Sequence, residues 1–209
     1  MAKNLDSKCK LCRREGEKLF LKGERCYTPK CAITKRNYPP GIHGVKGKPR
    51  LTNFGLQLRE KQKAKRIYQI SEKQFFNYYQ KASKKKGNTG ENMMQMLEMR
   101  LDNVVFKMGL TPSRSHARQL ITHNYYKVND KVVNIPSYQV KPKDVITLNE
   151  NKKDKKAFTV TAQVAEKMEV PGWLDVNEKE KTAKVANIPK LDEIQQPFNP
   201  ALIVEFYSR

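Results

Sequence analysis

Acidic side chains are scarce in this chain. Its 209 residues include 21 Asp and Glu against 42 Lys and Arg, which gives a formal net charge of +21. Residues 1–90 carry 24 basic and 6 acidic side chains, whereas residues 161–209 carry 6 basic and 8 acidic ones. So large an excess repels itself, and binding to a polyanion such as a nucleic acid neutralises it. The charge predicts a nucleic-acid partner for the N-terminal half and a protein or solvent contact near the acidic C-terminal region.

Long apolar runs are also missing. No stretch approaches the ~20 apolar residues of a membrane-spanning helix, and no basic amphipathic helix carries a bulky apolar face that would insert into lipid. The N-terminal sequence MAKNLDSKCK has neither the apolar core of a signal peptide nor the Arg/Ser-rich character of a transit peptide. We therefore expect a cytoplasmic protein without a membrane partner.

Sequence signatures of nucleotide-dependent enzymes are absent. Neither a G-x-G-x-x-G cofactor loop nor a P-loop occurs in the chain. The sequence thus favours a binding protein over an enzyme, and we expect no small-molecule substrate.

Cysteine is absent after residue 31. Cys9 and Cys12 form a C-x2-C pair, thirteen residues intervene, and Cys26 and Cys31 form a C-x4-C pair. Cytoplasmic thiols stay reduced, and two short pairs joined by a loop are typical of a tetrahedral zinc site. An iron–sulfur cluster also fits four thiolates, and four unligated thiols remain an alternative. A four-cysteine site leaves no open coordination position, so the predicted zinc is structural.

Basic residues surround these cysteines. We expect them to lower the pKa values of the thiols and to offset the net −2 charge of a zinc ion held by four thiolates. The five residues concerned are Lys8, Lys10, Arg13, Arg14 and Arg25.

Helical patterns dominate the middle of the chain. Residues 56–87 read as two cationic helices, the second beginning with a capping box of Ser71 and Gln74. Residues 92–108 place apolar side chains at helical spacing and predict one continuous helix. Ser113 is expected to cap the next helix, and Asn199 to cap a last helix over residues 201–207.

Short alternating segments predict strands in the C-terminal half. Asn129 and Asp130 are expected to form a tight turn between the first two of these strands. The predicted strands are 125–128, 131–133, 144–149, 157–162, 172–176 and 182–185.

Two groups of basic residues are the first candidates for phosphate contacts. Arg114 and Arg118 stand four residues apart on one helix face, where each guanidinium can bind one phosphate in a bidentate manner. Lys46, Lys48 and Arg50 alternate along residues 38–50, which read as an extended loop rich in proline and glycine, so their side chains would point to one side. A solvated helix face and a solvated linker are the alternatives.

Further polar and basic residues complete the predicted RNA-binding set. In the N-terminal part they are Arg13, Arg14, Arg59, Lys61, Lys63, Lys65, Arg66, Lys84 and Lys85. Around the arginine pair they are Ser115, Gln119, His123, Lys127 and Lys131.

Residues 97–121 resemble the small RNA-binding module named after the fourth small-subunit ribosomal protein. The matching positions are Leu97, Glu98, Arg100, Leu101, Val105, Lys107, Thr111, Ser113, Ala117, Arg118, Leu120 and Ile121. Longer segments extend the similarity over most of the chain, among them PPGIHG, FGLQLREKQKAKRIY, KGNTGEN, VVNIPSYQV and LIVEFYSR. The chain thus resembles the bacterial family of that ribosomal protein, in the form that carries a zinc knuckle.

This resemblance implies an α+β fold with a four-cysteine metal knuckle, a helical domain, and an RNA-binding domain of helices packed on a small, mostly antiparallel sheet. The implied domains are residues 1–45 for metal binding, 46–92 completed by the C-terminal helix 190–209, and 93–189 for RNA binding. Asn124 and Asp130 stand where many members have glycine, a replacement that is tolerated because Asn and Asp enter positive φ more easily than other residues. The cysteines occur in only part of the family, so the metal prediction rests on their spacing.

The resemblance also implies a function. It is that of a ribosome-bound structural protein of the small subunit, a primary assembly protein that grips a multi-helix junction in the 5′ domain of small-subunit rRNA. Contacts with the fifth small-subunit protein and with mRNA at the pore through which it enters are further implications. By position, Lys46, Lys48 and Arg50 match the mRNA-facing segment, and Arg114 and Arg118 match the rRNA-facing module.

Two alternatives differ in class. One is an RNA-modifying enzyme that carries the module as an appendage, but residues 134–209 are too short for its catalytic domain. The other is a regulatory or stress RNA-binding protein that carries the same module and acts off the ribosome. Retention on small subunits through a high-salt wash would separate a ribosomal protein from both alternatives.

Overall fold

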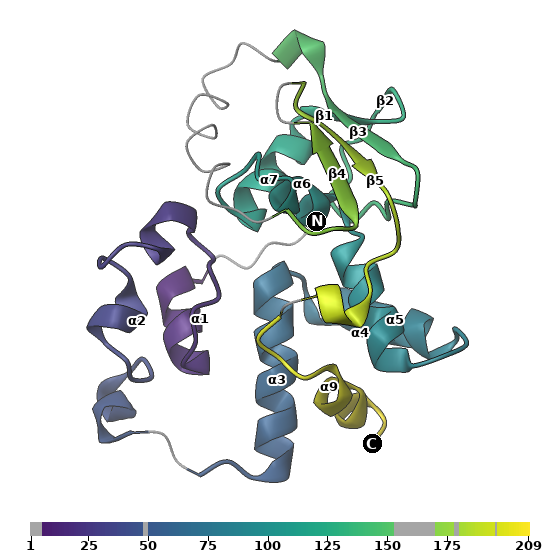
Figure 1. Ribbon diagram of the computed structural model, residues 1–209. Coiled ribbons are helices and arrows are strands. Elements are labelled where there is room, and N and C mark those ends of the chain that lie inside the picture. Colours follow the sequence, from purple (N-terminus) through teal and green to yellow (C-terminus); the bar gives the residue numbers. More distant parts are fainter. Residues whose placement is uncertain (1–5, 48–49, 153–169, 178–179, 195) are drawn as a thin grey trace. The chain divides into compact units, whose positions relative to one another are not determined.

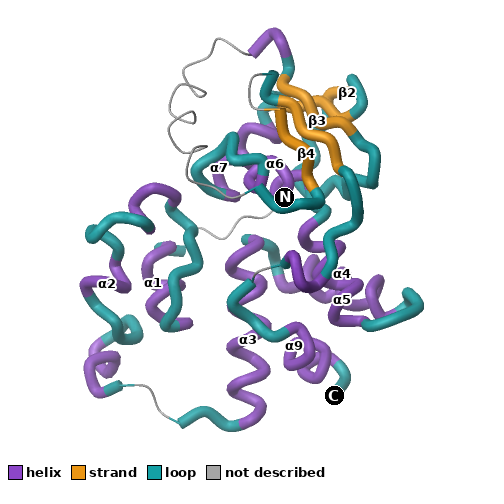
Figure 2. The backbone as a smooth tube through the Cα atoms, in the orientation of Figure 1, coloured by secondary structure: helices purple, strands orange, loops and turns teal. Residues whose placement is uncertain are grey.

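The computed structural model describes residues 6–47, 50–152, 170–177, 180–194 and 196–209 (Figure 1). The chain divides into two compact units. We call residues 1–93 with 196–209 the helical unit, and residues 94–195 the sheet unit. Helices and an antiparallel sheet together confirm the predicted α+β class (Figure 2). No helix in the described ranges is both long and apolar enough to cross a bilayer.

The helical unit begins with short elements around the cysteines and continues with longer helices. Side chains cap the starts of helices in this unit: Thr52 accepts a hydrogen bond from the Gly55 amide, Ser71 from that of Gln74, and Asn199 from that of Ala201. The caps predicted at Ser71 and Asn199 are thus confirmed. The elements are α1 (Lys8–Glu15), η1 (Gly23–Cys26), α2 (Ala32–Lys35), η2 (Ile42–Lys46), α3 (Asn53–Tyr68), α4 (Glu72–Ser83), the start of α5 (Thr89–Glu98), and α9 (Pro200–Tyr207).

The C-terminal helix α9 packs against α3 within this unit (Figure 1). Gln57 Nε2 donates to Glu205 Oε2 at 2.9 Å, and the Tyr207 hydroxyl donates to Glu72 Oε1 at 2.7 Å. Glu72 also accepts from Lys61 at 2.6 Å and from Lys65 at 2.9 Å. Burial acts to raise the pKa of Glu72, but these hydrogen bonds outweigh it and hold the pKa at about 2. One carboxylate therefore ties α3, α4 and α9 together.

The sheet unit packs two helices against a five-stranded antiparallel sheet with the order β2-β1-β3-β5-β4. Its buried core joins Phe106 and Leu120 from the helices with Tyr126, Ile146 and Trp173. The elements are the end of α5, α6 (Leu101–Lys107), α7 (Arg114–Thr122), β1 (Tyr126–Val128), β2 (Lys131–Val132), β3 (Val145–Leu148), η3 (Glu150–Lys152), β4 (Leu174–Asn177), β5 (Thr182–Val185) and η4 (Leu191–Glu193).

Local turn chemistry follows the sequence prediction in this unit. Asn129 and Asp130 have φ of 48° and 64° and connect β1 to β2, and Asn124 has φ of 62°. Asn and Asp are the non-glycine residues that most readily adopt such values. Ser113 caps α7 by accepting a hydrogen bond from the His116 amide, as predicted. The strand predicted over 157–162 lies outside the described residues.

The single helix predicted over 92–108 is wrong, because α5 ends at Glu98 and α6 begins at Leu101. Arg100 has extended backbone angles (φ −74°, ψ 138°) and forms a β-bridge with Gln139. The amide of Leu101 donates to Tyr138 O at 2.9 Å, and the amide of Val140 donates to Met99 O at 2.9 Å. Backbone bonds to a distant segment therefore replace the helical ones, and apolar spacing does not reveal this.

Candidate nucleic-acid interface and metal centre

A network of buried polar side chains lies where α5 gives way to α6. Arg100 is fully buried and binds Asp102 through two hydrogen bonds, Nε to Oδ1 at 3.0 Å and Nη2 to Oδ2 at 2.6 Å. A buried guanidinium needs such a bidentate partner, because a lone buried charge is costly. This pair therefore fixes the first turn of α6 to the break in the helix.

A second chain of hydrogen bonds reaches from the same break to the start of α7. Asn103 Nδ2 donates to Glu98 Oε2 at 2.7 Å, and Asn103 Oδ1 accepts from Arg114 Nε at 2.8 Å. The guanidinium carbon of Arg114 lies 4.5 Å from the centroid of the Phe106 ring. The orientation of Arg114 is thus set by a buried amide and an aromatic ring before any ligand arrives.

The structure separates the two arginines that the sequence paired. Arg114 is half-buried, whereas Arg118 is 7% exposed. Burial lowers the pKa of Arg118, and the negative charge of Asp102 acts against that shift. Arg118 is therefore turned toward the protein interior, and the two residues do not form an open pair on the helix surface. Its predicted phosphate contact stays a prediction.

The other predicted residues of this unit lie near the surface on α7 and the first hairpin. Their polar groups, like that of Arg114, lie where phosphate and sugar oxygens can reach them. The exposed members are Gln119, His123 and Lys131, and the half-buried ones are Ser115 and Lys127.

Several predicted RNA contacts on α3 are engaged within the helical unit. Glu15, whose side chain is fully buried, pairs with Arg59 and Arg66. Lys63 lies 2.8 Å from a carboxylate oxygen of Glu60 and 3.2 Å from one of Glu17. Lys61 and Lys65 bind the carboxylate of Glu72, which also accepts a hydrogen bond from Tyr207 on α9. These five cations are occupied by internal partners, so they have less to offer a phosphate than their positions in the sequence indicate.

The remaining basic candidates of the helical unit differ in their availability. Arg13 is half-buried and donates from Nε to Tyr38 O at 3.0 Å and from Nη2 to Pro39 O at 3.2 Å. Residues 38–50 do not form the extended loop we predicted, because η2 spans Ile42–Lys46. Lys48 lies outside the described residues. The exposed candidates are Arg14, Lys46, Arg50, Lys84 and Lys85.

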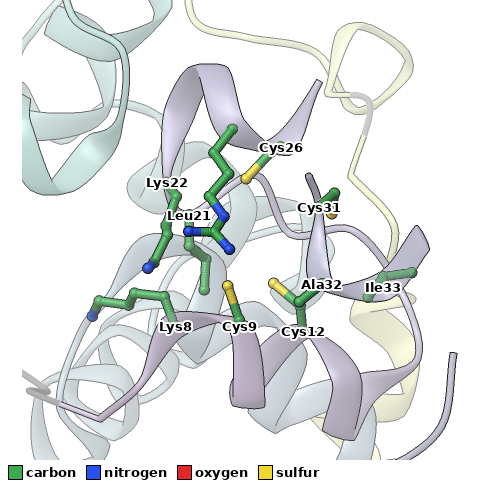
Figure 3. A pocket seen from close by; sticks show the side chains of 10 residues that line it. Lys8, Cys9, Cys12, Leu21, Lys22, Cys26, Cys31, Ala32 and Ile33 are labelled. Atoms are coloured by element: carbon green, nitrogen blue, oxygen red, sulfur yellow. The ribbon is translucent and has the colours of Figure 1, made fainter. Parts of the chain in front are cut away.

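The four cysteines line one pocket formed by α1, η1 and α2 (Figure 3). Its volume is about 20 Å³, which is room for one small ion or water. Lys8, Lys22 and Arg25 also line it and supply positive charge. Among the residues that the structure describes, however, no three His, Cys, Asp or Glu side chains are already arranged as metal ligands. The pocket gathers the thiols without placing them in coordination geometry.

Burial is the largest influence on the pKa values of Cys12, Cys26 and Cys31. It raises the pKa of Cys12 to about 11 and also raises the pKa of Cys26. Burial acts to raise the pKa of Cys31 as well, but hydrogen bonds with the backbone of Ile33 and Thr34 outweigh it and lower that pKa. The expectation that basic neighbours lower all four pKa values is therefore wrong for Cys12 and Cys26, because desolvation of these buried thiolates outweighs the interactions that stabilise them.

Sequence reasoning missed Asn103 and Glu98 as organisers of the interface. Both are almost completely buried, yet both fall in a stretch whose apolar spacing favours a plain amphipathic helix. No pattern in the sequence marks this pair, because residues five apart point in directions about 140° apart on a continuous helix.

Comparison with known proteins gives matches along the whole chain. The family described as "Ribosomal protein S4/S9 N-terminal domain" matches residues 3–98, and the "S4 domain" matches residues 99–146. Proteins named "Small ribosomal subunit protein uS4" from Thermodesulfovibrio yellowstonii and Nitrosospira multiformis are each 50% identical over 209 residues, and one from Koribacter versatilis is 51% identical. The similarity to each of these three proteins covers 100% of this chain and 100% of the relative. These matches confirm the resemblance seen in the sequence: the chain is a structural RNA-binding protein rather than an enzyme, and it belongs to the ribosomal protein S4 family.

Proposed function

We propose that this protein is a primary rRNA-binding protein of the small ribosomal subunit that grips a multi-helix junction in the 5′ domain of the rRNA. The observation that carries the proposal is the full-length similarity to proteins named as small-subunit components. As a component of the ribosome, the protein is cytoplasmic and ribosome-bound. The unequal distribution of its +21 net charge also suits a partner made of closely spaced phosphates.

The sheet unit supports this proposal through the way it presents α7. The buried links from Glu98 through Asn103 hold Arg114 at the first residue of α7. A guanidinium fixed in advance loses little conformational entropy when it binds a phosphate. Gln119, His123 and Lys131 lie exposed on the same helix and the following hairpin, so they can extend the contact along the RNA backbone.

Replacing Arg114 with Ala tests this role. We expect binding to a protein-free transcript of small-subunit rRNA to weaken by about 1.5–3 kcal/mol, the contribution of one charge-assisted contact. The slope of log K against log salt should fall by about 0.9, because one phosphate contact is lost. Filter binding over a range of salt concentrations measures both quantities.

Lys184→Ala is the matched control, since Lys184 is an exposed cation of the same unit that lies on β5. Its salt slope should equal that of the parent. Circular dichroism checks that each variant is folded. An unchanged slope for Arg114→Ala would place this arginine away from phosphate.

Contacts with mRNA and with the fifth small-subunit protein are further parts of the proposal. Lys46 and Arg50 are exposed at the end of η2 and just before α3, where they are available to an incoming strand. Replacing both with Ala should slow the translation of structured mRNA on reconstituted ribosomes while sparing unstructured mRNA. An equal effect on both messages would assign these residues to rRNA. Cross-linking within assembled subunits tests the contact with the fifth protein.

The four cysteines are proposed to bind one structural ion, Zn²⁺ or alternatively the iron of an iron–sulfur cluster. Their spacing, their common pocket and the surrounding positive charge support it. The ion would cross-link α1, η1 and α2, which are short elements with few large apolar residues. Metal binding would therefore contribute directly to the folding of this segment.

A further inference from the structure

The loop before α3 exposes two aliphatic side chains at its tip. Ile42 is 93% exposed and Val45 is 71% exposed, and both belong to η2. They are the two most exposed large apolar residues in the described part of the chain. Single exposed apolar residues are common on proteins and need no explanation. Two on one short helical turn form a small apolar tip, which we define as residues 41–46.

Hydrogen bonds and a close backbone contact fix the conformation of the tip and of the residues just before it. Arg13 donates to the carbonyls of Tyr38 and Pro39, and its guanidinium lies 4.7 Å from the centroid of the Tyr38 ring. The amide of Gly44 donates to Gly41 O at 3.1 Å. A Cβ at Gly44 would lie 1.9 Å from Pro39 O, so only glycine permits this close approach of the two backbone segments. The loop conformation is thus set before binding, which lowers the entropic cost of a contact.

The surroundings of the tip indicate the chemistry of its partner. Residues 25–50 carry seven basic side chains and no acidic one. Lys46 and His43 are exposed within the turn itself. A protein surface normally presents both signs of charge, so it would place some basic groups against this basic segment. A segment without any carboxylate complements a uniform polyanion.

We propose that the tip is an apolar wedge for RNA. Ile42 and Val45 pack against ribose and base edges in the wide, shallow minor groove of an rRNA helix, and the basic segment around them faces its phosphates. Proteins that bind the minor groove of DNA combine apolar wedges with basic residues, and the wide, shallow minor groove of an RNA helix displays riboses and base edges to such side chains. This inference rests on the proposed function, because it assumes that the protein binds rRNA.

The double variant Ile42→Ser/Val45→Ser tests the wedge in the full-length protein. We expect its binding to protein-free small-subunit rRNA to be about tenfold weaker, since partial burial of two aliphatic side chains contributes roughly as much as one fully buried side chain. The slope of log K against log salt should stay at the parental value, because no charge is removed. Hydroxyl-radical footprinting should show a short run of riboses that the parent protects and the variant does not.

The chain offers a matched control pair of the same residue types. Val170 is 38% exposed and Ile188 is 50% exposed in the sheet unit, away from the first hairpin. Val170→Ser/Ile188→Ser should bind with parental affinity if the effect is specific to the tip. Ile42→Leu should also retain affinity, because an aliphatic side chain remains.

Gly44→Ala supplies a second, independent test, since it keeps both aliphatic side chains but displaces the turn that carries them. It should weaken binding to a similar degree. Parental affinity and an unchanged footprint for the double Ser variant would overturn the wedge, as would an equal loss in the control pair. Failure of the parent itself to bind the rRNA would instead overturn the proposed function.

Discussion

Asp102→Ala is expected to lower the free energy of unfolding of the sheet unit by about 3–5 kcal/mol. The substitution removes two hydrogen bonds of Arg100, whose side chain has no solvent exposure, and takes away the carboxylate closest to its buried charge. Asp102→Asn should destabilise the sheet unit almost as much as Asp102→Ala, because it preserves the shape of the side chain but not its charge. Urea unfolding followed by tryptophan fluorescence measures the effect, since the single tryptophan of the chain, Trp173, is buried in this unit.

Asp175→Ala provides the control for this prediction. Asp175 is exposed on β4 and faces Lys184 across the ladder, so its removal should cost less than about 1 kcal/mol. Equal losses for Asp102→Ala and Asp175→Ala would show that the buried pair has no special role in stability.

Cys26→Ser is expected to abolish metal binding and to unfold residues around α1, η1 and α2, while the sheet unit stays folded. Structural zinc in small metal sites contributes on the order of 10–16 kcal/mol of apparent binding free energy, so loss of one of four ligands should be decisive for a segment with so little core. Elemental analysis of the purified parent should find about one zinc per chain, or iron with sulfide. Limited proteolysis should cleave the variant near its N-terminus.

Thr28→Ala is a suitable control, because Thr28 is an exposed residue between Cys26 and Cys31 that supplies no thiol, and its hydroxyl donates to Arg25 O at 3.1 Å. This variant should retain its metal and its resistance to protease. A metal-free parent whose N-terminal region already resists protease would contradict the metal proposal.

Elements fixed by neighbours in sequence were predictable. The caps at Ser71, Ser113 and Asn199 each depend on a side chain and an amide two or three residues away, and the turn at Asn129 and Asp130 depends on two residues that tolerate positive φ. Features that depend on distant partners were not. The break at Arg100 arises because residues 136–140 supply the backbone bonds that a continuous helix would have made internally.

The same distinction applies to the candidate interface. The sequence identified α3 as cationic, but not that carboxylates such as Glu15 and Glu72 would fold back onto its basic residues. The sequence identified Arg114 as a candidate phosphate ligand from its position on a helix. The orientation of the Arg114 side chain, however, depends on Asn103, eleven residues earlier. Helical spacing also paired it with Arg118, because spacing says which residues share a face and not which part of that face is covered. Charge counts locate a basic region, and only the fold shows which charges remain available.

This protein is a structural component of the small ribosomal subunit that binds its rRNA, and the most direct test of that role is its co-sedimentation with small subunits after a high-salt wash. The protein should stay with the subunit at about one copy per particle, because its dissociation requires many phosphate contacts to be released together. Release into the soluble fraction, as expected of a regulatory RNA-binding protein that acts off the ribosome, would contradict it.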